Sequence, residues 1–326
     1  MNKNEVILEV QNLVVEFDAS RRRKVHAVSG VSFRLRKGET LGLVGESGCG
    51  KTTVARSIMQ LCRPTSGRVL FKGEDLTQTG SDLLQKLRPL FQMIFQDSIS
   101  SLNPRRKVGE TIAAPLRIIG KGDRTERTRR ACEMMEAVGL DPAQAFNRRP
   151  FQFSAGQCQR ISIARALMAE PKLLICDEPV SALDVSVQAQ IINLLEDMRV
   201  RYGLTMLFIS HDLSVIKNVC DQVAVMYLGK LCEIAPSERL YRKPRHPYTA
   251  ALFGAIPQPD PKHPQREVKM LTGELPSPTN PPSGCRFRTR CPHAKERCAE
   301  FEPQLKEFEP GHQVACHFPI YEGGAR

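Results

Sequence analysis

The chain has 326 residues, with 41% hydrophobic and 25% charged residues, which allows a sizeable core and excludes global disorder. No apolar run approaches the roughly 20 residues that a membrane helix needs, and the N-terminus does not read as a signal peptide, so a soluble cytoplasmic protein is expected. The formal net charge of +12 suits a nucleic acid, a phosphorylated ligand or an anionic membrane surface without choosing among them.

The N-terminal part of the chain predicts short strands. Apolar residues alternate or run together at 6–10, 13–17, 31–35 and 40–44. The last of these is apolar on both faces, which is typical of a buried parallel strand. A helix is expected from Lys51 to about Cys62.

The remainder of the first 255 residues mixes helices with buried strands. Residues 97–170 favour helices, at 110–119, 124–138 and 157–168. Strands are then predicted at 172–176, 205–209 and 222–227, with helices at 185–200 and 213–219. Strands that alternate with helices indicate an α/β fold with a mostly parallel sheet covered on both faces.

The sharpest motif lies between the strand at 40–44 and the helix that begins at Lys51. It follows the pattern G-x-x-x-x-G-K-[ST] and consists of Gly45, Glu46, Ser47, Gly48, Cys49, Gly50, Lys51 and Thr52, with Thr53 next in the chain. Glycines let successive backbone N–H groups turn toward phosphate oxygens, and the helix N-terminus adds positive charge. Lys51 adds a cation for the β- and γ-phosphates, and the Thr52 hydroxyl suits Mg²⁺. The motif predicts a nucleotide phosphate-binding loop.

Two acids follow the apolar strand at 172–176. Asp177 and Glu178 come at its carboxyl end, where parallel sheets bind their ligands. Asp177 is a candidate Mg²⁺ ligand, and Glu178 is a candidate proton acceptor for attacking water.

The chain contains further motifs that resemble those of the ATP-binding-cassette (ABC) ATPases and that follow one another in the order found in that family. They are Gln96 of the Q-loop, the signature around Ser154, Gly156 and Gln157, the D-loop at 181–184 and the switch histidine His211. The resemblance implies a P-loop NTPase fold with a RecA-like core, an antiparallel β subdomain and a helical subdomain at about 97–170. It also implies ATP hydrolysis with Mg²⁺ at sites shared by two ATPase chains.

The resemblance also implies roles for individual residues. Glu178, His211 and Gln96 would be catalytic, with Thr52, Gln96 and Asp177 around Mg²⁺ and Phe17 stacking on adenine. Ser154, Gly156 and Gln157 would face the ATP of the partner chain. The chain departs from the family pattern at three positions. Ala155 stands where glycine is usual and where a positive φ would strain the loop, and Cys158 stands where a basic or polar residue is common. Thr52 replaces the more frequent Ser, which is a conservative change.

Several segments narrow the resemblance to the dipeptide/oligopeptide and nickel importer branch, closest to the second ATPase subunit of the peptide permeases. They include 101–105, 180–186, 225–229, 245–249 and 273–278. This implies peptide uptake and a peripheral place on the cytoplasmic face of the inner membrane. The implied partners are a paralogous ATPase, two transmembrane permease subunits and, indirectly, an extracytoplasmic solute-binding protein. Nickel, glutathione or another small solute is the alternative cargo. A soluble ABC ATPase acting on nucleic acid is the other alternative, disfavoured by the single phosphate loop.

The tail after about Pro257 is rich in proline and carries four cysteines, so we expect a linker followed by an extension held by other means than a core. The cysteines are Cys285, Cys291, Cys298 and Cys316. Four thiolates suit a metal centre, and the branch resemblance implies a 4Fe-4S cluster. Zinc is the alternative, with His293, His312 or His317 replacing one cysteine. We expect an ATPase domain at 1–255 and this extension at 256–326.

Overall fold

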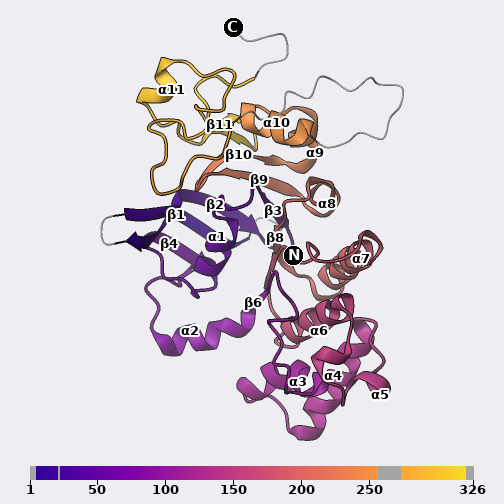
Figure 1. Ribbon diagram of the computed structural model, residues 1–326. Coiled ribbons are helices and arrows are strands. Elements are labelled where there is room, and N and C mark those ends of the chain that lie inside the picture. The colour runs from indigo at the N-terminus through magenta and orange to yellow at the C-terminus, as the bar shows by residue number, and fades with distance from the viewer. Residues whose placement is uncertain (1–4, 21–22, 256–272, 321–326) are drawn as a thin grey trace, which may run out of the picture. The chain divides into compact units, whose positions relative to one another are not determined.

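The computed structural model of the chain describes residues 5–20, 23–255 and 273–320 (Figure 1). It divides into two compact units. The first comprises Met1–Ile7, Leu35–Glu39 and Gln78–Ile209, and the second comprises Leu8–Arg34, Thr40–Thr77 and Ser210–Arg326. The predicted linker after Pro257, up to residue 272, and the first four residues lie outside the described residues.

The first unit has parallel strands in the order β8-β7-β6. They are β6 (Phe91–Ile94), β7 (Leu173–Asp177) and β8 (Thr205–Ile209). Every residue of β7 and β8 is buried, which explains their continuous apolar sequences. This unit also contains α2 (Ser81–Leu87), the 3₁₀ turn η1 (Arg88–Leu90) and α7 (Val185–Tyr202).

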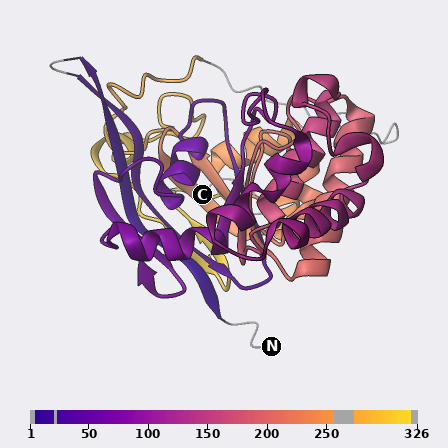
Figure 2. The same cartoon turned by 90° about the horizontal axis from the view of Figure 1, so that it is seen from below.

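A group of helices follows β6 in the same unit. It consists of α3 (Val108–Ile118), α4 (Arg124–Ala137), α5 (Pro142–Ala145), the 3₁₀ turn η2 (Pro150–Gln152) and α6 (Ala155–Leu167). Helix α3 packs against both α4 and α6, and Figures 1 and 2 show these helices gathered together in magenta. Ile112, Leu116, Met135 and Ile161 are fully or almost fully buried here.

The second unit has a small sheet in the order β2-β1-β4-β5. Its strands are β1 (Val6–Ser20), β2 (Arg23–Arg36), β4 (Ser66–Phe71) and β5 (Glu74–Asp75). The register between β1 and β4 shifts between Gln11 and Val14. The strands predicted at 6–10 and 13–17 are therefore one strand with an irregularity.

The other strands of the second unit run in the order β11-β12-β10-β9-β3. They are β3 (Thr40–Val44), β9 (Gln222–Tyr227), β10 (Lys230–Pro236), β11 (Lys306–Glu309) and β12 (His312–Val314). Strand β3 is parallel to β9, and the other pairs are antiparallel. The helices are α1 (Lys51–Ile58), α8 (Leu213–Val219), α9 (Ser237–Arg242), α10 (Pro247–Gly254) and α11 (Glu296–Glu300).

The predicted α/β class is confirmed, and most predicted helices lie within a few residues of those observed. The expectation of a mostly parallel sheet needs correction, because β10, β11 and β12 add antiparallel pairs that the sequence did not predict. No helix in the described part of the chain has the length and apolar character to cross a membrane.

Candidate functional site

The phosphate loop connects β3 to α1 in a conformation that its glycines permit. Gly45, Gly48 and Gly50 all have positive φ, of 151°, 78° and 105°. A Cβ at Gly45 would lie 2.0 Å from the carbonyl oxygen of Met226, and one at Gly50 would lie 2.2 Å from that of Ala27. Glycine is therefore required at both positions by close backbone contact as well as by φ.

Lys51 lies inside this loop and is almost fully buried. Its Nζ donates hydrogen bonds to the carbonyl oxygens of Gly45, at 2.8 Å, and Glu46, at 3.1 Å. Burial raises the pKa of the neighbouring Cys49 thiol, which makes this cysteine a packing residue of the loop. The lysine thus sits at the first turn of α1, where its charge and the helix N-terminus add together.

Two predicted catalytic side chains meet in the first unit. The Gln96 side-chain amide donates a hydrogen bond to the Glu178 carboxylate, 2.9 Å from Nε2 to Oε2. Glu178 directly follows β7 with φ of 47°, a left-handed conformation that costs a non-glycine residue energy. Its N–H donates to the carbonyl oxygen of Ile209 in β8, at 2.9 Å. Asp177, the last residue of β7, is buried.

The signature segment forms the start of α6. Ser154 is the N-cap: its hydroxyl accepts the Gln157 N–H at 3.3 Å, and the Gln157 side chain accepts the Ser154 N–H at 3.1 Å. This reciprocal capping is what the S-x-x-Q spacing favours. Gly156 packs closely against α7, because a Cβ there would lie 2.6 Å from Val187 Cγ1.

Ala155 and Cys158, the departures from the family pattern that lie in α6, fit this helix without strain. Ala155 is the first residue of α6 and is not among the described non-glycine residues with positive φ, so the strain considered for it does not arise. Cys158 is buried, and its thiol contacts the carbonyl oxygen of Pro150, at 3.5 Å.

His211 and Phe17 belong to the second unit and are exposed. The loop around His211 is fixed by its neighbours: the Ser210 hydroxyl accepts the Asp212 N–H at 2.9 Å, and the Asp212 carboxylate caps α8. Phe17 on β1 is 44% exposed, which leaves its ring available for stacking. The phosphate loop is also in the second unit, whereas Gln96, Asp177, Glu178 and the signature are in the first.

All four tail cysteines line one cavity of the second unit, together with His293 and His317. All eleven cysteines of the chain are free thiols. The pKa of Cys291 is raised to about 11 and that of Cys316 to about 12, mainly by burial and in smaller part by the neighbouring tail cysteines. Nevertheless, across residues 5–20, 23–255 and 273–320, no group of three or more His, Cys, Asp or Glu is arranged to hold a metal ion.

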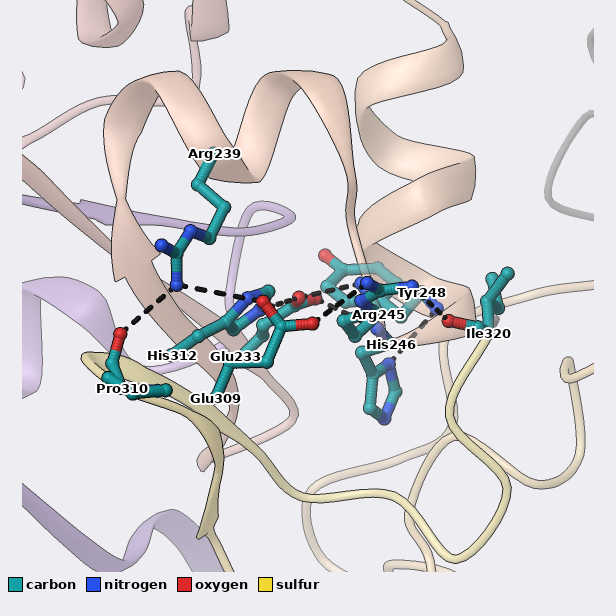
Figure 3. A network of polar contacts seen from close by, with 9 residues as sticks. All are labelled: Glu233, Arg239, Arg245, His246, Tyr248, Glu309, Pro310, His312 and Ile320. Carbon is teal, nitrogen blue, oxygen red and sulfur yellow. Dashed lines mark hydrogen bonds and ion pairs between the residues drawn. The ribbon is translucent and has the colours of Figure 1, made fainter. Parts of the chain in front are cut away.

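His312 does not line this cavity, although the sequence offered it as a ligand. It is fully buried, and its Nε2 donates to the Glu233 carboxylate at 2.6 Å (Figure 3). Glu233 also accepts the N–H groups of Arg245, at 2.7 Å, and His246, at 2.9 Å. His312 is therefore part of the polar network that joins β12 to the start of α10.

The sequence did not predict that Tyr248 of α10 and Arg290 of the tail contact the phosphate loop. The Tyr248 hydroxyl accepts the Glu46 N–H at 3.0 Å, and Arg290 Nη1 donates to both Glu46 carboxylate oxygens, at 2.9 and 3.0 Å. The segment 245–249 was singled out as a branch motif, which was the available signal for Tyr248. Nothing in the sequence pointed to a role for Arg290 except its position next to Cys291.

Residues 28–181 match the family described as ABC transporter, and residues 232–298 match the oligopeptide/dipeptide transporter C-terminal region. The oligopeptide transport ATP-binding protein OppF of Salmonella typhimurium is 50% identical over 326 residues, covering 97% of each chain. AppF of Bacillus subtilis, an oligopeptide transport ATP-binding protein, is 50% identical over 321 residues, covering 96% of this chain and 97% of its own.

Solved structures agree with this. The ATP-binding cassette MJ0796, in a dimeric post-hydrolysis state bound to ADP and Pi, matches with a TM-score of 0.65 and 27% identity, over 71% of this chain and 99% of its own. These findings define an ABC-type P-loop ATPase, as the motifs predicted. The chain belongs to the ABC transporter ATP-binding proteins, in the branch that carries the oligopeptide/dipeptide transporter C-terminal region.

Proposed function

We propose that this chain hydrolyses ATP to power the uptake of di- and oligopeptides through separate membrane subunits. The observation that carries the proposal is the 50% identity to OppF over 97% of both chains, which includes the tail as well as the ATPase motifs. Nickel, glutathione or another small solute remains the alternative cargo, because the ATPase subunit does not itself select the solute.

The phosphate loop would bind the ATP phosphates. Lys51 Nζ, now bonded to the carbonyl oxygens of Gly45 and Glu46, would turn its charge to the β- and γ-phosphates. The N–H groups of residues 48–53 and the N-terminus of α1 would add donors. Phe17 would stack on the adenine.

Glu178 would accept a proton from the attacking water, and His211 would orient that water and the γ-phosphate. The hydrogen bond from Gln96 supports this role, because it fixes the carboxylate without protonating it. Thr52, Asp177 and Gln96 offer the oxygen ligands that suit Mg²⁺, which when bound neutralises phosphate charge.

Ser154, Gly156 and Gln157 would contact the ATP held by a second ATPase chain. The capped N-terminus of α6 supports this, since it presents backbone N–H groups and a partial positive charge. The partner would be a paralogous subunit, and the pair would dock on two permease subunits at the cytoplasmic face of the membrane, with an extracytoplasmic solute-binding protein delivering the peptide. Closure on ATP and opening after hydrolysis would drive the permeases.

We further propose that the four tail cysteines ligate a 4Fe-4S cluster, within an extension spanning 256–326 that follows the ATPase domain. The donor set suits such a cluster, because the four cysteine thiols line one cavity. The resemblance to the peptide-importer branch is the reason for proposing a cluster, and zinc stays the alternative. The described residues themselves show no group of three or more His, Cys, Asp or Glu arranged to hold a metal ion. When bound, the cluster would add cross-links to a tail in which Phe287 and Val314 are already buried.

The partner assignment predicts a weak ATPase when this chain is purified alone and strong activity once a paralogue and the permeases are present. The reason is that each ATP site needs a signature from another chain. Mass measurement of the assembled complex is expected to find one copy of this chain. Two copies with no paralogue would contradict the heteromeric arrangement.

A further inference from the structure

Two residues from beyond the ATPase motifs hold Glu46, the second residue of the phosphate loop. The Tyr248 hydroxyl accepts a hydrogen bond from the Glu46 N–H. The Arg290 guanidinium donates to both carboxylate oxygens of Glu46. The Arg290 side chain is only 7% exposed and that of Glu46 26% exposed, so this ion pair is shielded from water. A shielded ion pair with two hydrogen bonds is worth more than a pair on the surface.

A second tail arginine reaches the loop through the turn between β9 and β10. Arg286 donates hydrogen bonds to the carbonyl oxygen of Leu228 and, at 2.8 Å, to the Ser29 hydroxyl. The next residue of that turn, Gly229, donates its N–H to the carbonyl oxygen of Cys49 in the phosphate loop, at 2.9 Å. Arg286 and Arg290 therefore support the loop at two points, and both lie between Cys285 and Cys291.

The segment that carries Arg286 and Arg290 is held in place by aromatic packing. Phe287, between the two arginines, packs edge-on against Tyr227 at 5.2 Å and lies 5.3 Å from Tyr248, centroid to centroid. All three rings are almost fully buried. Tyr248 is fixed in turn because its N–H donates to His246 Nδ1 at 3.0 Å, within the network around Glu233 (Figure 3).

The negative charge of Glu46 explains why Arg290 affects the binding of an anionic ligand. Glu46 places a carboxylate in a loop whose remaining features, Lys51 and the N-terminus of α1, attract phosphate. Unpaired, this carboxylate would repel the phosphates across a short distance in a partly dry site. Arg290 cancels that charge and also holds the residue whose carbonyl oxygen accepts a hydrogen bond from Lys51 Nζ.

We propose that Arg290 is a positioning residue for ATP, acting through Glu46 to neutralise and hold the phosphate loop. The tail is thereby part of the nucleotide site. This inference rests on the proposed phosphate-binding role of the loop at 45–52.

The test measures the ATP dissociation constant of the full chain, with thermal unfolding measured in parallel. Arg290→Met is expected to weaken ATP binding on the order of tenfold, since hydrogen bonds to charged groups are worth enough for such a change. Glu46→Gln combined with Arg290→Met is expected to recover part of this loss, because no bare carboxylate remains although the link between the tail and the loop is still missing. Arg297→Met, an exposed arginine of α11 in the same tail, removes the same charge and is expected to bind ATP normally.

In the assembled complex, Arg290→Met is expected to raise the KM for ATP and leave kcat nearly unchanged. Unchanged affinity in Arg290→Met would overturn the inference, as would a double variant that binds no better than the single one. If Arg290→Met does not fold, Arg290→Gln decides: glutamine is polar but removes the positive charge, so a similar loss is expected, and full affinity would overturn the inference.

Lys51→Ala distinguishes failure of the Arg290 inference from failure of the proposed phosphate loop. If Lys51→Ala loses ATP binding while Arg290→Met does not, the inference alone is wrong. If Lys51→Ala also binds ATP normally, the assignment of the phosphate loop itself is wrong.

Discussion

Glu178→Gln is expected to bind Mg-ATP normally and to slow hydrolysis at its own site by about 100-fold or more, the range in which general bases act. Glutamine keeps the size of the side chain and can still accept the hydrogen bond from Gln96. It cannot take up the proton of the attacking water. Single-turnover hydrolysis by the assembled complex, at the site that contains Glu178, measures this directly.

Glu170→Gln provides the matched control. Glu170 lies in the same unit, also has a positive φ, and pairs on the surface with Lys121 and Arg130. Its substitution is expected to leave turnover unchanged. Undiminished single-turnover hydrolysis in Glu178→Gln would remove Glu178 from the proposed mechanism.

Cys298→Ser is expected to abolish the iron content of the protein and expose the tail to proteolysis. The unsubstituted protein, purified anaerobically, is expected to be brown, with about four irons and four acid-labile sulfides. Cys298 is buried, and its carbonyl oxygen accepts the Cys285 N–H at 2.8 Å, so losing one ligand disturbs another. Iron and sulfide assays with limited proteolysis make the measurement.

Cys62→Ser is the control, since Cys62 lies after α1, does not line the cavity of the tail cysteines and is partly exposed. It is expected to keep the full iron content. A colourless protein with stoichiometric zinc would reject the cluster and retain a metal site. A metal-free protein whose tail resists protease equally well would reject both.

Local signals in the sequence predicted the buried strands β3, β7, β8 and β9 but not β6 or β10. Strands β8 and β9 begin and end at the predicted residues, because five or six consecutive apolar or β-branched residues leave few alternatives. Strands β11 and β12 gave no such signal: they read Lys-Glu-Phe-Glu and His-Gln-Val and form through pairing that starts from β10. Non-local pairing of short polar segments is invisible to periodicity.

In the candidate site, too, some local features could be predicted from the sequence and contacts between distant residues could not. The phosphate loop is local, so its spacing alone predicted it. The capping of α6 by Ser154 and Gln157 is also local, but it was not predicted. The pair of Arg290 and Glu46 joins residues 244 positions apart, which no local pattern reveals. Ala155 shows the opposite case, where a family pattern suggested strain and the helical backbone removes it.

The central claim is that ATP bound by this chain powers peptide uptake. The most direct measurement is ATP-dependent accumulation of a labelled oligopeptide in proteoliposomes that contain the permeases, the paralogous ATPase and the solute-binding protein, with this chain intact or carrying Glu178→Gln. The account predicts accumulation with the intact chain and its near-complete loss with the variant. Equal accumulation with both chains, or ATP hydrolysis without any peptide uptake, would contradict it.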